Sequence, residues 1–139
     1  MDADKEISSL KKDKAKAQLT GNLKDLAEVC NYLGSKLSER GRFEDALEEH
    51  NEELSISKRL GDDLGVIIAH RCIGEVYAEM EMYRKSLDNL KLYLSKAEKA
   101  KNVVELQRAW ATLGRTYFMK GDLDKSDRAH QMALQLTEK

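Results

Sequence analysis

The chain has 139 residues, of which 35% are charged, and it carries a formal net charge of −1 and no proline. This balance leaves no basic surplus, so nucleic acid is a poor first choice of partner. The longest apolar run, VIIA at 66–69, is too short for a membrane span or a secretory signal, and two cysteines do not make a disulfide framework. We therefore expect one soluble intracellular domain with reduced thiols and a core of its own.

The first predicted element is a helix within residues 1–22. A helical spacing relates Ile7, Leu10, Lys14 and Ala17, so these side chains share one face. We expect this helix to cover the apolar side of the unit that follows it.

A repeat of 40 residues occupies the rest of the chain. Its three copies align without gaps as NYLGSKL (31–37), RCIGEVY (71–77) and ATLGRTY (111–117). Each copy has an apolar residue before its glycine and a leucine or tyrosine three residues after it. The period predicts three units, at residues 23–62, 63–102 and 103–139.

Each unit is predicted to contain two helices joined by a short break. Apolar residues recur on one face of the first helix. The second helices are predicted to begin near Glu44, Arg84 and Asp124. Asp62 or Asp63 is expected to cap the helix that opens the second unit.

A glycine stands inside each first helix, where it costs about 1 kcal/mol relative to alanine. A small residue follows twelve positions later in every copy. We expect the two helices to pack closely at these positions, which gives the pairs Gly34–Ala46, Gly74–Ser86 and Gly114–Ser126. Such packing would offset the loss of helix propensity.

The histidines and cysteines do not suggest a zinc site, because no pair has the close spacing of metal ligands such as Cys-x-x-Cys. Cys30 and His70 share a column with Trp110 that is predicted to pack in the core. Cys30 is therefore expected to be a buried, unreactive thiol.

The acidic run EDALEEHNEEL (44–54) lacks any sign of a pocket and predicts a solvated helix face. A protein-binding acidic patch is the less favoured interpretation. No nucleophile–base pair, metal set or phosphate loop is evident, so we expect no enzyme, no metal and no cofactor.

The aligned columns resemble those of a tetratricopeptide repeat. Trp110, Leu113, Gly114 and Tyr117 match the first-helix pattern closely, whereas serine stands at two positions where alanine is usual. The resemblance implies an all-α solenoid of seven helices without strands, stacked as a right-handed superhelix.

The period of 40 and the linker LGDDLG (60–65) resemble the longer subtype of Pins-like spindle-orientation scaffolds. A closer resemblance is to the N-terminal repeats of the Tonsoku-like family. It is carried by KAKAQ (14–18), RFEDALEEHNEEL (42–54), AHRCIGEVYAEMEMY (69–83) and LQRAWATLGRTY (106–117). This resemblance implies a non-catalytic nuclear scaffold in replication-fork repair that contacts core histones and a dedicated repair partner, without direct contact to nucleic acid or membrane.

In tetratricopeptide repeats the first helices line a concave groove, and the resemblance supplies candidate peptide contacts. Counted from the glycine of each unit, these are Glu28, Asn31, Ser35, Ile68, Arg71, Glu75, Arg108, Ala111, Arg115 and Phe118. Their three arginines are predicted to form a basic strip for carboxylates. Alternatively, Arg71 and Glu75 simply pair along one helix. A basic histone tail would instead need Glu28 and Glu75.

Other functions stay open at this point. A Pins-like adaptor would hold partner peptides in the same groove, whereas a spacer would bind nothing there. The last helix pair has no capping element, so it is expected to expose apolar surface and could self-associate. The resemblance favours the nucleus, with the cytoplasm also open.

Overall fold

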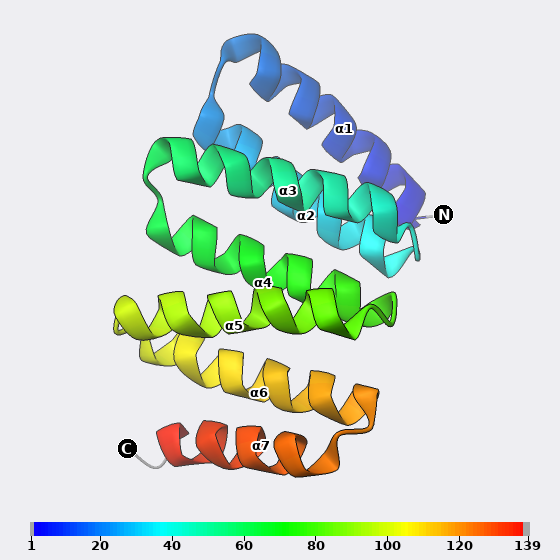
Figure 1. Ribbon diagram of the computed structural model, residues 1–139. Coiled ribbons are helices and arrows are strands. Elements are labelled where there is room, and N and C mark those ends of the chain that lie inside the picture. The colour runs from blue at the N-terminus through cyan, green and yellow to red at the C-terminus, as the bar shows by residue number, and fades with distance from the viewer. Residues whose placement is uncertain (1, 138–139) are drawn as a thin grey trace. The chain divides into compact units, whose positions relative to one another are not determined.

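The computed structural model describes residues 2–137, with side chains from residue 4 onward (Figure 1). This range contains no strand and seven helices: α1 (Asp2–Thr20), α2 (Leu23–Glu39), α3 (Phe43–Leu60), α4 (Asp63–Glu79), α5 (Tyr83–Lys99), α6 (Val103–Lys120) and α7 (Leu123–Thr137). The predicted all-α class, with one N-terminal helix and three helix pairs, is confirmed. The starts of α3, α5 and α7 lie one residue before the predicted ones. Within the described residues, every helix is too short or too polar for a bilayer crossing.

The chain divides into two compact units, Met1–Cys72 and Ile73–Lys139, and the division falls inside α4. In the first unit α2 packs against both α1 and α3. Ala17, Leu26, Cys30 and Ile56 form a buried cluster drawn from these three helices. Burial of apolar side chains such as Leu26 and Ile56 stabilises the unit by about 1.5–3 kcal/mol each. The expectation that the N-terminal helix covers the apolar side of its neighbour is confirmed.

In the second unit α6 packs against α5 and α7. Leu90 and Tyr93 of α5 and Leu113 of α6 are almost fully buried. The buried Tyr93 hydroxyl donates a hydrogen bond of 2.6 Å to Glu105 Oε1, which satisfies both polar groups. Apolar packing and one buried polar pair therefore hold α5 to α6.

The interior glycines are sites of close helix packing, as predicted, but their partners differ in part. Ser86 Oγ donates to the carbonyl of Gly74 at 2.6 Å, and Ser126 Oγ donates to Gly114 at 2.8 Å. These bonds explain how serine replaces alanine there without leaving a buried hydroxyl unpaired.

The space that a Cβ would need at each interior glycine is occupied by the side chain of the residue sixteen positions later. A Cβ on Gly34 would lie 2.6 Å from His50 Nε2, so His50, and not Ala46 as predicted, fills the gap. His130 stands in the same relation to Gly114, at 2.7 Å. The missing methyl group is therefore replaced by an imidazole ring in two of the three pairs.

Every turn between successive helices has the same backbone geometry. A residue with left-handed φ follows each of the first six helices, at positions 21, 41, 61, 81, 101 and 121. The next residue donates its N–H to the carbonyl five positions back, as from Asp62 to Ser57 at 2.9 Å and from Asn102 to Ala97 at 3.1 Å. Four of these left-handed residues are glycines, and the other two are Glu81 and Lys101.

Lys101→Gly is expected to raise the free energy of unfolding by roughly 0.5–1 kcal/mol. Lys101 has a φ of 53°, a conformation that costs a non-glycine residue about 1–2 kcal/mol, while the added chain entropy of glycine offsets part of the gain. Urea denaturation measures the difference. The control Lys99→Gly lies two residues earlier, within α5, and should lower stability by about 0.5–1 kcal/mol. A loss of stability in both variants would contradict the argument.

Candidate functional site

A cavity of about 220 Å³ opens in the Met1–Cys72 unit beside α2, the end of α3 and the start of α4. Its lining consists of Lys24, Ala27, Glu28, Asn31, Tyr32, Glu53, Ser57, Leu60, Asp62, Leu64, Gly65 and Ile68. Three predicted groove residues, Glu28, Asn31 and Ile68, meet here. The remaining lining residues were not predicted.

The turn between α3 and α4 shapes one wall of this cavity. Gly61 takes a left-handed φ of 67°, and the backbone N–H of Gly65 donates to Asp62 Oδ1 at 3.0 Å. Asp62 therefore caps α4, which was one of the two predicted alternatives. A Cβ on Gly65 would lie 2.6 Å from Ser57 Oγ, so glycine permits the close approach of α4 to α3.

The cavity combines an apolar rim with a surplus of carboxylates. Tyr32 and Leu64 are 59% and 48% exposed, and large exposed side chains of this kind are typical of interaction sites. Glu28, Glu53 and Asp62 supply three acidic groups against one lysine among the lining residues. Such a cavity suits a partner side chain with an apolar stem and a cationic end.

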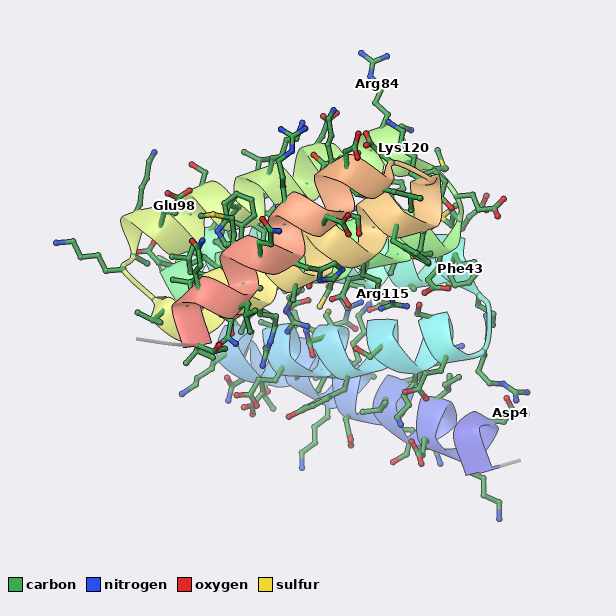
Figure 2. All side chains as sticks on the ribbon, turned by 90° about the horizontal axis from the view of Figure 1, so that it is seen from below. Asp4, Phe43, Arg84, Glu98, Arg115 and Lys120 are labelled. Carbon is green, nitrogen blue, oxygen red and sulfur yellow. The ribbon has the colours of Figure 1, made fainter. Side chains whose placement is uncertain are left out.

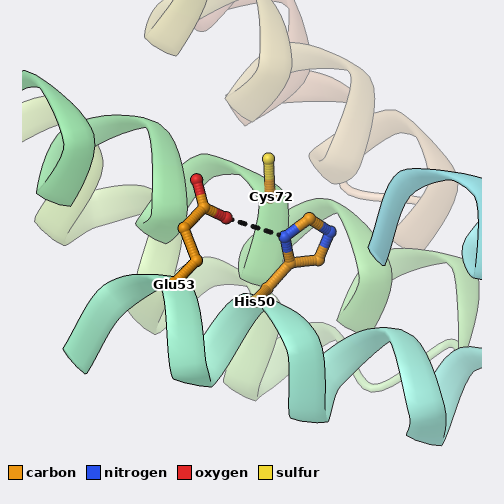
Figure 3. A group of neighbouring side chains, drawn as sticks. All are labelled: His50, Glu53 and Cys72. Atoms are coloured by element: carbon orange, nitrogen blue, oxygen red, sulfur yellow. Dashed lines mark hydrogen bonds and ion pairs between the residues drawn. The ribbon is translucent and has the colours of Figure 1, made fainter. Parts of the chain in front are cut away.

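A buried polar cluster includes His50, Glu53 and Cys72 (Figure 3), and Glu53 also lines the cavity. His50 Nδ1 and Glu53 Oε1 are 3.0 Å apart, and both residues are at most 5% exposed. Asn31 Nδ2 donates to Glu53 Oε2 at 2.9 Å and to Cys72 Sγ at 3.6 Å. The cluster thus joins α2, α3 and α4 within the first unit.

The acidic run at 44–54 is only in part the solvated face that was predicted, since Glu44 and Glu48 are exposed. Glu53 is buried, while Glu49 and Glu52 both accept hydrogen bonds from Lys14 Nζ, at 2.8 and 3.0 Å. Burial lowers the pKa of Lys14, but the bonds to both carboxylates outweigh it and raise that pKa. The prediction was wrong for Glu49, Glu52 and Glu53, because side chains of α1 and α2 pair with them.

Cys30 is fully buried, as predicted, and burial followed by the nearby Glu52 charge raises the pKa of its thiol to about 12. Cys72 is partly exposed. We expect a neutral disulfide reagent at mildly alkaline pH to modify Cys72 quickly and Cys30 only as fast as the fold opens, because the thiolate is the nucleophile. Time-resolved peptide mass spectrometry measures both rates. Equal rates in the folded chain would contradict this expectation, and equal rates in denaturant provide the control.

A second candidate surface lies on α6 in the Ile73–Lys139 unit. Arg108, Ala111, Arg115 and Phe118 follow one another at helical spacing, and all four are exposed. Arg115 pairs with Glu79 at 3.2 Å and Arg108 with Glu105 at 3.3 Å. We call these four residues the α6 stripe. It presents two guanidinium groups beside an aromatic ring that is 65% exposed.

The other predicted groove residues do not line the cavity of the first unit. Ser35 on α2 and Arg71 on α4 are partly buried, and Glu75 belongs to the second unit, where it is also partly buried. A surface shared by Arg71 and the two arginines of the α6 stripe stays a prediction.

Sequence comparison finds relatives of the chain among Tonsoku-like proteins. No protein-family model matches it. The Tonsoku-like protein of Mus musculus is 48% identical over 117 residues, or 84% of this chain, and that of Bos taurus is 43% identical over all 139 residues. The Drosophila melanogaster protein is 37% identical over 92% of the chain. The chain is a homologue of part of the Tonsoku-like proteins. It spans only 9–10% of the length of these Tonsoku-like relatives.

Solved structures agree with the repeat fold of this chain. The TPR domain of Arabidopsis FLU matches with a TM-score of 0.76 and 18% identity, over 84% of this chain and 98% of that one. BtubC (BKLC) from P. vanneervenii matches with a TM-score of 0.87 and 17% identity, over 98% of this chain and 57% of that one. At such identities the likeness shows the fold alone.

Proposed function

We propose that the chain is a non-catalytic protein-interaction segment of a nuclear Tonsoku-like scaffold in replication-fork repair. The observation that carries the proposal is the apolar and acidic cavity beside α2. It brings three residues of the predicted groove together with an exposed tyrosine and leucine. Concave sites with an apolar rim and a few convergent polar groups are typical binding sites.

Core histones and a fork-repair partner are the ligands that the family resemblance implies. The charges of the cavity support a basic ligand, because Glu28 and Asp62 outnumber Lys24 there, even without the buried Glu53. We therefore propose that a lysine or arginine side chain of a histone enters this cavity.

Binding to purified histone H3–H4 tests the histone proposal. Glu28→Lys is expected to weaken binding by about tenfold, which corresponds to about 1.4 kcal/mol. Glu48→Lys is the matched control, because Glu48 is an exposed residue of α3 that does not line the cavity. If both variants bind as the unchanged chain does, the cavity is not a histone site.

The α6 stripe is proposed to engage a carboxylate-bearing segment of a second partner, in an extended or helical form. Arginine binds carboxylates in bidentate fashion, and Phe118 beside it offers apolar contact. Arg108 and Arg115 have exposed side chains, at 48% and 62%, so their existing ion pairs contribute little to stability.

Capture of partners from nuclear extract, followed by mass spectrometry, tests the α6 stripe. The double variant Arg108→Glu/Arg115→Glu should lose acidic partners and keep its thermal midpoint. Arg84→Glu/Arg128→Glu is the matched control. Both of its residues are exposed on α5 and α7, and Arg84 projects into solvent (Figure 2). Unchanged capture by both double variants would favour a spacer function.

Self-association is a second candidate function, and the surface of α7 favours it. Leu123 and Leu134 are 57% and 60% exposed, and their spacing of eleven residues places both on one face of α7, where exposed apolar residues are typical of an interaction surface. Sedimentation equilibrium tests this candidate against a scaffold that binds other proteins, including a Pins-like adaptor. An apparent mass that rises with concentration, and that returns to the monomer value in the Leu134→Glu variant, supports self-association. A monomer mass at all concentrations excludes self-association.

A further inference from the structure

The buried cluster of the first unit contains three side chains that are metal ligands in many proteins. One ring nitrogen of His50, a carboxylate oxygen of Glu53 and Cys72 Sγ all lie within 4.8 Å of one another. Figure 3 shows the three side chains converging from α3 and α4. His50 and Glu53 are three residues apart on α3, so both project from the same face of the helix.

Glu53 is buried with Asn31 and His50 as its polar partners, and a cation there would add further compensation for its charge. Glu53 is 5% exposed and His50 is 1% exposed. A carboxylate removed from water needs a compensating positive charge or several hydrogen bonds. A divalent ion would balance the Glu53 carboxylate and a Cys72 thiolate together, with the imidazole neutral.

We propose that His50, Glu53 and Cys72 bind one zinc ion. Zinc takes nitrogen, sulfur and oxygen ligands at about 2.0–2.3 Å in a tetrahedron, so its ligand atoms lie roughly 3.3–3.6 Å from one another. The observed separations of at most 4.8 Å are close to that range, and the side chains would move closer together on binding. Binding requires a neutral His50 imidazole whose proton lies on the nitrogen that does not face the ion, and it releases the thiol proton of Cys72.

The surroundings of the cluster hold the ligands in place. Asn31 donates to both Glu53 and Cys72, and partners of this kind orient metal ligands. The His50 ring packs against Gly34 with no room for a methyl group between them. Its Nδ1 edge is therefore fixed toward Glu53.

The cavity provides an entry path for the ion. Glu53 and Asn31 both line it, so an ion in the cavity would meet the cluster at Glu53. Three protein ligands leave the fourth zinc position for water from the cavity or for a ligand group.

The repeat does not require this set of residues. Forty residues after His50 and Glu53 come Leu90 and Tyr93, and forty after Cys72 comes Thr112. The fold therefore accommodates leucine, tyrosine and threonine at the positions where the first unit carries the three ligands.

The other cysteine, Cys30, is not placed to bind a metal ion. Glu49 and Glu52 lie near Cys30, but the Lys14 ammonium already bridges both carboxylates. A divalent ion there would face a positive charge at close range. Cys30 is thus a matched control for Cys72.

Cobalt(II) is the probe for the test, because it takes zinc sites and reports their ligands by absorption. The whole chain, reduced and freed of metal, is expected to bind one equivalent and to develop a thiolate-to-cobalt charge-transfer band and the intense visible bands of a tetrahedral ion. Zinc should displace cobalt and raise the thermal midpoint of the chain. Absence of the charge-transfer band in the folded chain would overturn the proposal.

Variants distinguish binding at the proposed zinc site from adventitious metal binding elsewhere on the chain. Cys72→Ala should abolish the charge-transfer band, and Glu53→Gln should weaken zinc binding by at least about 100-fold, whereas Asn31→Ala should weaken it by about 10–100-fold. Cys30→Ala should retain both band and affinity. Circular dichroism checks that each variant is helical. Retention of the band in Cys72→Ala, or its loss in Cys30→Ala with the helices intact, would reject the assignment. This test does not depend on partner binding, so it stands apart from the proposed scaffold function.

Discussion

Gly34→Ala is expected to lower the free energy of unfolding by about 2–3 kcal/mol, whereas Gly114→Ala should change it by less than about 1 kcal/mol. A Cβ at either glycine would come within 2.6–2.7 Å of a histidine ring. The difference lies in the histidines: His50 is 1% exposed, while His130 is exposed. A confined ring cannot move aside, and overpacking of a buried site costs about 1–3 kcal/mol.

The partner ring of Gly114 is free to rotate toward solvent, so the added methyl group meets little resistance. Alanine also gains about 1 kcal/mol of helix propensity over glycine, which offsets what strain remains. Urea denaturation of both variants at one pH makes the comparison. Similar large losses in the two would show that the close approach of the backbones, and not the burial of the ring, determines the cost.

The helices and their order could be predicted from sequence because the same residue pattern occurs in three copies of the repeat. Gly34, Gly74 and Gly114 are 40 residues apart, and the apolar columns around them agree without gaps. Agreement of independent copies removes most of the ambiguity of a single helical pattern. The close packing at these glycines was predicted for the same reason.

The shorter period of the turns was missed, although the sequence carries it. Glycines at 21, 41, 61 and 121 mark left-handed turns every 20 residues, and Glu81 and Lys101 interrupt the series. Because non-glycine residues rarely adopt this conformation, the glycine positions alone do not reveal the turns at Glu81 and Lys101. Spacing, read at half the repeat length, would have located every helix end.

The candidate site was only partly predictable. Glu28, Asn31 and Ile68 were reached by column, but the cavity they line depends on how the turn after α3 brings Asp62 and Leu64 beside α2. That placement is tertiary and leaves no local pattern.

The buried cluster was missed for a related reason. Glu53 sits in an acidic run that suggests a solvated face, and Cys72 is 19 residues further along the chain. One signal was present: the column of Glu53 carries Tyr93 and Ala133 in the later copies. A carboxylate in a column of buried residues calls for a partner, and the structure supplies His50 and Asn31.

The buried His50–Glu53 pair is expected to show strong energetic coupling in chelator-treated protein. Either single change, His50→Leu or Glu53→Leu, removes one partner and should lower the free energy of unfolding by about 3–5 kcal/mol. The double variant should lose much less than the sum, by a coupling of roughly 3 kcal/mol, because two apolar residues leave no buried charge uncompensated. Leu90 and Tyr93, both fully buried at the corresponding positions of α5, show that the fold accepts large side chains there.

Denaturation in urea at neutral pH, with chelator present throughout, yields the four free energies of this double-mutant cycle. Glu48→Leu, an exposed change on the same helix, should stay within about 0.5 kcal/mol of the unchanged chain. Losses that add up in the double variant would mean that Asn31 alone satisfies the Glu53 carboxylate and that the imidazole contributes only packing. A large coupling energy, by contrast, shows that the His50–Glu53 pair stabilises a charged group inside the first unit. The stability measured without metal is also the reference against which the effect of zinc binding at the same residues is measured.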